Sequence, residues 1–143
     1  MKIEDVEKMW EEDCEIDSVD LAGSALNIPK LHNKYFKIYN AIRLKILSLK
    51  DKQTDLIKIK NEYYSGKLSK EELDEYGWEP FLFTLKSDIN TYLEADKDLI
   101  KLLEKKVYHE ECVSVIESIM NELKQRTWQL RSFIDYEKFI GGN

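Results

Sequence analysis

Glycine and proline are scarce in this sequence, with five and two copies among 143 residues. Both residues punctuate the short strands and tight turns of β-sandwiches and barrels, so their scarcity argues against an all-β fold. Charged side chains of both signs are instead mixed with leucine and isoleucine, a composition typical of helices. The apolar content of 43% is enough to build a core. We therefore expect one all-α domain over residues 1–143, with long helices and short connecting helices.

Cysteine and histidine are also rare, and neither occurs at a metal-binding spacing. Cys14 and Cys112 are far apart in the sequence, and no CxxC or HxxxH element is present. This argues against structural zinc and dithiol redox chemistry, and we expect both thiols to be reduced. The acidic amino terminus lacks the basic and apolar regions of a secretory signal, and no apolar run approaches the length of a membrane span. We expect a soluble, intracellular protein without membrane contact.

The common catalytic and nucleotide-binding motifs are absent. The sequence contains no GxxxxGK[ST] phosphate-binding loop, no GxGxxG, no GxSxG and no HExxH. Neighbouring acidic residues occur at Asp96-Lys97-Asp98 and Glu110-Glu111, but adjacent side chains on a helix point about 100° apart. A solvated face is therefore the favoured interpretation of both. We predict no catalytic residue, no metal site and no cofactor, and hence a protein that is not an enzyme.

The net charge is −6, but the two signs are separated along the chain. Residues 1–29 carry two basic and nine acidic side chains, whereas residues 30–60 carry nine basic and two acidic ones. The remaining residues, 61–143, carry eleven basic and seventeen acidic side chains. A basic block thus lies between two acidic segments. It can bind a polyanion, or it can pair with the acidic ends of the same protein.

The basic block coincides with a predicted long helix. No glycine or proline occurs between Pro29 and Gly66, and apolar residues recur there at spacings of three and four. A helix of about 35 residues is on the order of 50 Å long. A globule of this size cannot bury such a helix along its whole length, so we expect long helices to pair within or between chains. Five lysines fall within about 80° of one another beside the apolar stripe and are called the lysine rail. They are Lys30, Lys34, Lys37, Lys45 and Lys52.

The segment before this helix is predicted to contain two shorter helices. An amphipathic pattern covers residues 2–14, and Asp17-Ser18 supplies N-cap residues for a second short helix from Leu21 to about Asn27. Pro29 suits the first turn of the long helix, where its missing N–H group would have no partner. The resulting division is 1–28 for the short N-terminal helices and 29–66 for the long basic helix.

Helical patterns also dominate the region after the long helix. Gly66 is placed to cap the long helix, and Ser69–Glu72 forms a capping box for a short helix that Gly77 interrupts. Helical spacing then covers residues 81–139, either as one helix or with a new start near His109.

The end of the long helix combines positive charge with aromatic rings. Lys58 and Lys60 are followed within four residues by Tyr63 and Tyr64. Single-stranded nucleic acid is bound by this combination of phosphate contacts and flat faces on which bases stack. The alternative is structural, with the tyrosines packed on the core and the lysines extended from the helix edge. Spacing alone favours the structural interpretation, but Lys60 falls within the apolar stripe, where a charge is costly unless it is paired or faces a ligand.

Three short elements give the chain a family resemblance. They are Ile16-Asp17-Ser18 with Leu21, the stretch LIKIKNEYYSGK over residues 56–67, and LEADKD over residues 93–98. In combination they resemble the UvsY family of recombination mediators of T-even-like phages, over nearly the whole chain. The sequence departs from the family pattern at Lys60, where the family typically has arginine, and in residues 68–80, to which no role is carried over.

The resemblance implies a helical protein that forms a closed homo-oligomeric ring, a hexamer or heptamer, through its C-terminal helices. It also implies binding to single-stranded DNA, a weakened hold of the phage single-strand-binding protein, and loading of a RecA-like recombinase of the UvsX type. The place of action would be the cytoplasm of the infected bacterial host. Lys58 and Lys60 match the family's basic pair, and helix geometry and stacking add the other candidates. The DNA-binding candidates are Lys58, Lys60, Lys45, Lys52, Tyr63 and Tyr64.

For assembly, we expect apolar side chains of the C-terminal segment to contact neighbouring subunits. A ring multiplies a weak basic patch by its subunit number, so several low-affinity contacts with one strand become avid. The candidates for oligomerisation are Val113, Ile116, Met120, Leu123 and Leu130.

Two other function classes compete with this hypothesis. A coiled-coil scaffold without DNA affinity, in which the lysine rail pairs with the acidic N-terminal segment, is favoured by composition and periodicity alone. A small metal- or nucleotide-dependent enzyme requires a cofactor site that the sequence does not contain.

Overall fold

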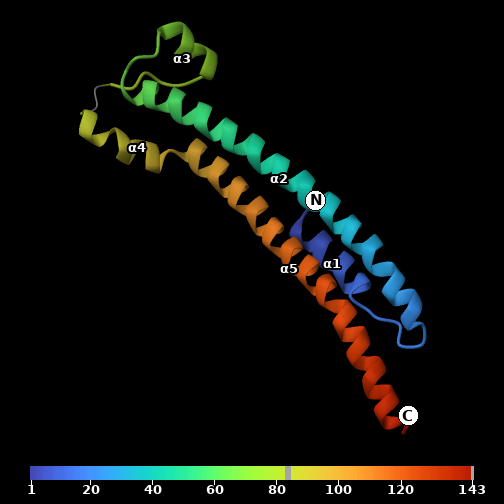
Figure 1. Ribbon diagram of the computed structural model, residues 1–143. Coiled ribbons are helices and arrows are strands. Elements are labelled where there is room, and N and C mark those ends of the chain that lie inside the picture. Colours follow the sequence, from blue (N-terminus) through green and yellow to red (C-terminus); the bar gives the residue numbers. More distant parts are fainter. Residues whose placement is uncertain (83–84, 143) are drawn as a thin grey trace. The chain divides into compact units, whose positions relative to one another are not determined.

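The secondary structure of the described part of the chain is entirely helical (Figure 1). The computed structural model describes residues 1–82 and 85–142, and no strand occurs among them. The predicted all-α class is confirmed. No helix in this described part carries an apolar stretch long enough to cross a membrane. The elements are α1 (Ile3–Asp13), α2 (Leu21–Tyr64), α3 (Lys70–Tyr76), the 3-10 turn η1 (Lys86–Asp88), α4 (Ile89–Ala95) and α5 (Lys97–Ile140).

Helix α2 begins earlier than the sequence predicts. The expected break between a short helix ending near Asn27 and a long helix beginning at Pro29 is wrong, because α2 is continuous and contains Pro29. A proline inside a helix removes one backbone hydrogen bond and crowds the preceding turn. Leu31 and Tyr35 follow Pro29 closely and are buried. Their burial offsets the local cost of the proline, so the helix runs through it.

The first turn of α2 is capped by Asp20 rather than by Asp17-Ser18. The Asp20 carboxylate accepts a hydrogen bond from the backbone N–H of Gly23 at 2.9 Å. Asp17 instead accepts the N–H of Val19 at 2.9 Å, outside the helix. A Cβ atom at Gly23 would lie 2.1 Å from an oxygen of Asp20. A larger residue at position 23 would therefore require the Asp20 side chain to shift from its present position.

The other end of α2 has the geometry predicted from Gly66. This residue has a φ of +71°, and its N–H donates to the carbonyl of Tyr63 at 3.1 Å. The N–H of Lys67 donates to the carbonyl of Glu62 at 2.9 Å. The two bonds form a Schellman motif, which ends the helix through a residue in the left-handed region.

The short helix predicted from the capping box is confirmed as α3. The hydroxyl of Ser69 accepts the N–H of Glu72 at 3.2 Å. The helix ends at Gly77, which has a φ of +69°.

The C-terminal helices begin later than predicted. Residues 81, 82 and 85 are not helical, and the first turn is η1; residues 83 and 84 of the predicted segment lie outside the described residues. Both possibilities left open for the rest are wrong: α5 runs through His109 without a new start, but the segment is not one helix, because it breaks at Asp96 between α4 and α5.

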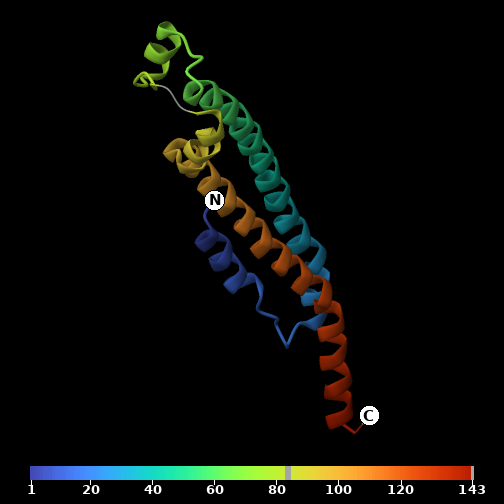
Figure 2. The ribbon, with the colours of Figure 1, turned by 90° about the vertical axis from the view of Figure 1, so that its left-hand side faces the viewer.

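The chain forms two compact units, which are described separately. The first comprises Met1–Leu44 and the described residues from His109 onward. In it, α1 lies against the first part of α2 and the last part of α5 (Figures 1 and 2). All three helices contribute to its core. The largest fully buried side chains are Tyr35, Ile116, Leu123, Val6 and Cys112.

Polar contacts at the end of α1, here called the α1 clasp, hold this helix in place. The Asp13 carboxylate accepts hydrogen bonds from Lys34 at 2.6 Å and from the Tyr35 hydroxyl at 2.8 Å. Burial and the hydrogen bond to Asp13 raise the pKa of Tyr35. Arg126 is buried and donates to the backbone carbonyls of Asp13 and Cys14 at 3.1 and 3.0 Å. Its charge lies at the C-terminal end of α1, where the helix dipole favours a cation.

The second unit comprises Lys45–Tyr108, apart from residues 83 and 84. It contains the end of α2, all of α3 and α4, and the start of α5, which follows α4 after Asp96 (Figure 1). Leu49 and Leu99 are buried there, but so are the charged residues Lys60 and Asp96. Charged side chains are almost never fully buried unless they are paired. The contacts of these two residues therefore define the polar centre of the unit.

Candidate nucleic-acid interface

Lys60 is the central cation of the second unit, and only 5% of the residue is exposed. Its Nζ atom lies 3.0 Å from a carboxylate oxygen of Asp96 and 2.8 Å from one of Asp98. The same atom lies 4.0 Å from the ring centroid of Trp78, a cation–π contact. Burial by itself lowers the pKa of Lys60, but the hydrogen bonds to Asp98 and Asp96 outweigh burial and the pKa lies above its ordinary value. Lys60 is therefore charged, paired and covered.

Asp96 connects the end of α2 to the start of α5. Its carboxylate accepts hydrogen bonds from the Tyr64 hydroxyl at 2.5 Å and from the backbone N–H of Leu99 at 3.0 Å, in addition to the ion pair with Lys60. The bond to Leu99 makes Asp96 the N-cap of α5. Burial raises the pKa of Asp96, but these hydrogen bonds and the Lys60 charge outweigh it and hold the pKa below its ordinary value. Burial and the bond to Asp96 raise the pKa of Tyr64.

Six aromatic side chains in mutual contact, here called the aromatic cluster, meet this ion pair through Tyr63, Tyr64 and Trp78. Trp78 stacks on Tyr76 with ring centroids 4.6 Å apart, and it lies 5.1 Å from Tyr63. Tyr64 meets Phe81 edge-on at 5.0 Å. The Tyr63 hydroxyl donates to the backbone carbonyl of Glu79 at 2.6 Å. The aromatic cluster comprises Tyr63, Tyr64, Tyr76, Trp78, Phe81 and Tyr92.

The six residues predicted to bind DNA fall into two groups. Lys60, Tyr63 and Tyr64 lie together in the polar centre and the aromatic cluster, so the structural interpretation that spacing favoured for the tyrosines describes their surroundings. The other three, Lys45, Lys52 and Lys58, are exposed on α2. In the described part of the chain, none of these three makes an ion pair.

The interpretation of Asp96-Lys97-Asp98 as a solvated face is wrong for Asp96. Its side chain is 4% exposed, whereas that of Asp98 is 55% exposed. The physical reason is the position of Lys60 in the apolar stripe, because a buried cation requires a carboxylate partner. The charge of Lys60 was the signal that could have identified such a partner. Sequence analysis assigned no role to Trp78, which lies in the segment that diverges from the family.

The predicted oligomerisation residues also divide into two groups. Ile116, Leu123 and Leu130 are buried within the first unit, by side chains of the same chain. Val113 and Met120 are partly exposed. Other apolar side chains near the end of α5 remain open, with exposed fractions of 70% for Trp128 and 82% for Phe139. The exposed apolar residues of this segment are Trp128, Phe133, Ile134, Tyr136, Phe139 and Ile140.

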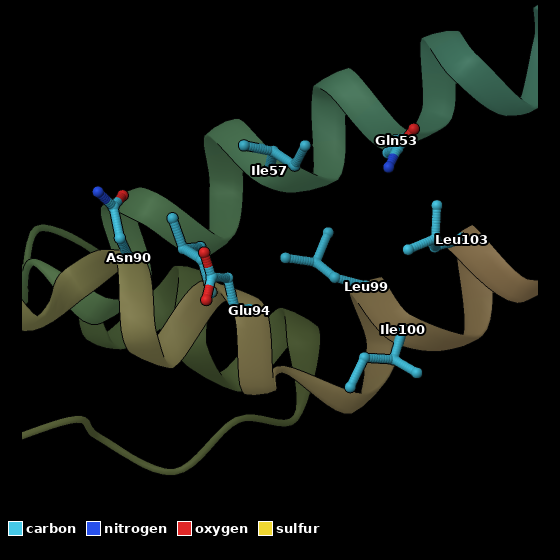
Figure 3. Close-up of a pocket in the computed structure, with 8 residues that line it drawn as sticks. Gln53, Ile57, Asn90, Glu94, Leu99, Ile100 and Leu103 are labelled. Atoms are coloured by element: carbon cyan, nitrogen blue, oxygen red, sulfur yellow. The ribbon is translucent and has the colours of Figure 1, made fainter.

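The second unit also contains an apolar groove of about 350 Å³ between α2, α4 and α5 (Figure 3). Leu99 and Leu103 point from α5 toward Ile57 and Gln53 of α2. Its lining holds no lysine or arginine, so the groove offers no positive charge to a phosphate backbone. The lining residues are Gln53, Ile57, Asn90, Leu93, Glu94, Leu99, Ile100 and Leu103.

Comparison with known proteins gives a match over nearly the whole chain. A family model described as recombination, repair and ssDNA binding protein UvsY matches residues 9–143. The chain belongs to the UvsY family. The resemblance inferred from three sequence elements is thereby confirmed.

Relatives in the UvsY family share the length of the chain as well as its fold. The chain is 25% identical to the recombination protein uvsY of Enterobacteria phage T4 over 142 residues, which cover 99% of both sequences. It matches the lattice type II crystal structure of the bacteriophage T4 recombination mediator protein UvsY with a TM-score of 0.84 and 24% identity, over 99% of this chain and 98% of that one. The lattice type I structure matches with a TM-score of 0.82 and 24% identity, over 94% and 98%. These structural matches show a common UvsY fold.

The description of the UvsY family names binding and recombination and indicates no catalytic activity. Within the residues that the structure describes, no group of three or more His, Cys, Asp or Glu side chains is placed to hold a metal ion.

Proposed function

We propose that the chain is a phage recombination mediator that binds single-stranded DNA and promotes loading of a RecA-like recombinase onto strands covered by single-strand-binding protein. The observation that carries this proposal is the set of exposed, unpaired lysines on α2 in a member of the UvsY family. Lys45 and Lys52 are seven residues apart and share a helix face. Lys58 adds a further charge beyond them. Lysines of this kind neutralise phosphates without regard to base sequence, as a mediator requires.

Assembly into a closed homo-oligomeric ring, a hexamer or heptamer, is part of the proposal. Helix α2, which contains nearly all of the predicted basic helix, would supply the strand contacts, and α5 would join the subunits. Exposed apolar side chains such as Trp128 and Phe139 support this assignment, because contiguous exposed apolar surface marks interaction sites. Ile116 and Leu123 support it less, since they are already covered within the chain.

The mediator would act by binding alone, without a cofactor, in the cytoplasm of the infected bacterial host. Its partners would be single-stranded DNA, the recombinase, the single-strand-binding protein and other copies of itself. A ring holds several lysine sets on one strand, so weak contacts add to a useful affinity. The strand would then be presented to the recombinase in a form less accessible to its competitor.

The scaffold alternative is favoured by one contact. Lys34 of the lysine rail pairs with Asp13 of the acidic N-terminal segment at 2.6 Å. In the described part of the chain, the other four lysines of the rail make no ion pair. The rail is therefore left largely available for an external anion.

Fluorescence anisotropy with a labelled oligo-dT strand distinguishes the two functions. We expect binding whose logarithmic affinity falls linearly with the logarithm of the salt concentration, by about 0.7 for each phosphate neutralised. The triple variant Lys45→Gln, Lys52→Gln, Lys58→Gln should show a smaller slope at unchanged helix content. If the wild-type chain does not bind the strand even at very low salt, the scaffold function is supported and the mediator function is refuted.

A further inference from the structure

The two lysines of the basic pair lie on opposite sides of α2. Side chains two residues apart on a helix point about 160° away from each other. Lys58 is exposed, whereas Lys60 is buried. One strand running along the helix can therefore reach Lys58 without reaching Lys60.

The surroundings of Lys60 also exclude a phosphate. Its Nζ atom already has two carboxylate partners, Asp96 and Asp98, and the ring of Trp78 covers it. One positive and two negative charges leave this site with a net negative charge. A phosphate would have to displace a paired carboxylate and would meet repulsion from the remaining one.

We propose that Lys60 is a positioning residue, which holds the end of α2, the start of α5 and the aromatic cluster in register, and that Lys58 makes the phosphate contact. Lys60 bonds Asp96 and Asp98 from the start of α5 and lies beneath Trp78, which follows α3. Through Asp96 it is linked to Tyr64, whose hydroxyl shares the same carboxylate. The inference rests on the proposed function, since strand binding is one of its two readouts.

The test compares two charge-removing variants of the same helix. Lys60→Met keeps the unbranched side chain up to the position of Cε and removes the charged Nζ atom, and Lys58→Met does the same on the exposed side. The first readout is the slope of log affinity against log salt for labelled oligo-dT. The second is the ¹⁹F NMR spectrum of the chain labelled with 5-fluorotryptophan, in which Trp10 and Trp128 serve as internal references for Trp78.

A positioning role and a contact role give opposite patterns. We expect Lys60→Met to shift the Trp78 resonance and to lower affinity by the same factor at every salt concentration, with the slope unchanged. Lys58→Met should leave the Trp78 resonance in place and reduce the slope by at least about 0.7. Lys60→Arg should restore the affinity and the Trp78 resonance, because a guanidinium can pair with the same carboxylates.

Three outcomes overturn the inference: a reduced slope in Lys60→Met, a Trp78 resonance that does not move in Lys60→Met, or failure of Lys60→Arg to restore the affinity and the Trp78 resonance. If Lys60→Met does not fold, Asp98→Asn is tested in its place, because it removes one of the two carboxylate partners of Lys60. An increase in the salt slope of Asp98→Asn over the wild type would mean that the released Lys60 contacts phosphate, and the inference would fail. An unchanged salt slope would mean that Lys60 stays with Asp96, and the inference would stand. A wild-type chain that does not bind DNA refutes the proposed function, and the Trp78 resonance still decides whether Lys60 orders the cluster.

Discussion

Replacement of Asp96 by asparagine isolates the charge of the buried ion pair. Asparagine has nearly the same shape, but only one of its two terminal atoms accepts a hydrogen bond, so it can keep the N-cap bond from Leu99 or the bond from Tyr64 but not both. The change therefore removes one negative charge and one hydrogen bond, and it leaves Lys60 with Asp98, which is half exposed. Breaking a buried pair by removing one partner costs about 3–5 kcal/mol. We expect the lower end, about 3 kcal/mol, because one carboxylate remains.

Thermal unfolding followed by circular dichroism measures this cost. For a chain of this size, 1 kcal/mol corresponds to roughly 3 °C in Tm, so Asp96→Asn should unfold about 10 °C below the wild type at neutral pH. Asp98→Asn is the matched control, since it removes the same charge from the same ammonium group at an exposed position. A pair with an exposed partner contributes only about 0–1 kcal/mol, so its Tm should change by no more than about 3 °C.

The reasoning is refuted if Asp96→Asn unfolds within 2 °C of the wild type, a margin of roughly 1 kcal/mol. It is also refuted if Asp98→Asn is destabilised as much as Asp96→Asn. Either result would mean that burial of the ion pair does not determine its contribution to the stability of the fold.

Four further outcomes follow from the same structure. Since the pKa of Asp96 is lowered in the folded state, its contribution to stability is fully present above the ordinary pKa of 3.8 and is lost as the pH falls through the lowered pKa. The difference in urea midpoint between wild type and Asp96→Asn should therefore shrink from pH 6 to pH 2.5. Leu123→Ala should cost about 2–5 kcal/mol in urea unfolding, because the side chain is fully buried. Phe139→Ala should leave stability within about 0.5 kcal/mol but lower the particle mass in light scattering, and an unchanged mass would exclude Phe139 from the subunit contact. Gly66→Ala should cost about 1 kcal/mol in urea unfolding, because its φ is positive.

Local rules predicted the C-terminal cap of α2 and the start of α3, although they placed the N-cap of α2 at Asp17-Ser18 instead of Asp20. The glycine cap of α2 and the capping box of α3 each involve groups within five residues of one another, so sequence spacing is enough to identify them. Pro29 shows the limit of such rules, because burial of Leu31 and Tyr35 outweighs the local tendency of proline to begin a helix. Tertiary contacts of this kind are not visible in a short window of sequence.

The candidate site was predictable only in part for the same reason. Helical periodicity placed Lys60 in the apolar stripe, and this position required a partner. The partner, Asp96, is far away in the sequence, and a carboxylate beside another acidic residue is typical of a solvated face. Periodicity likewise predicted that Ile116 and Leu123 face an apolar surface, but it does not distinguish the surface of the same chain from that of a neighbour.

The α1 clasp has a consequence for the tolerance of this chain to substitution. Arg126 bonds the backbone carbonyls of Asp13 and Cys14, not their side chains. Every amino acid carries such a carbonyl, so this half of the attachment is indifferent to which residues occupy the two positions. Substitutions of the side chains at the end of α1 therefore leave the acceptors of Arg126 in place, whereas substitution of Arg126 removes both hydrogen bonds.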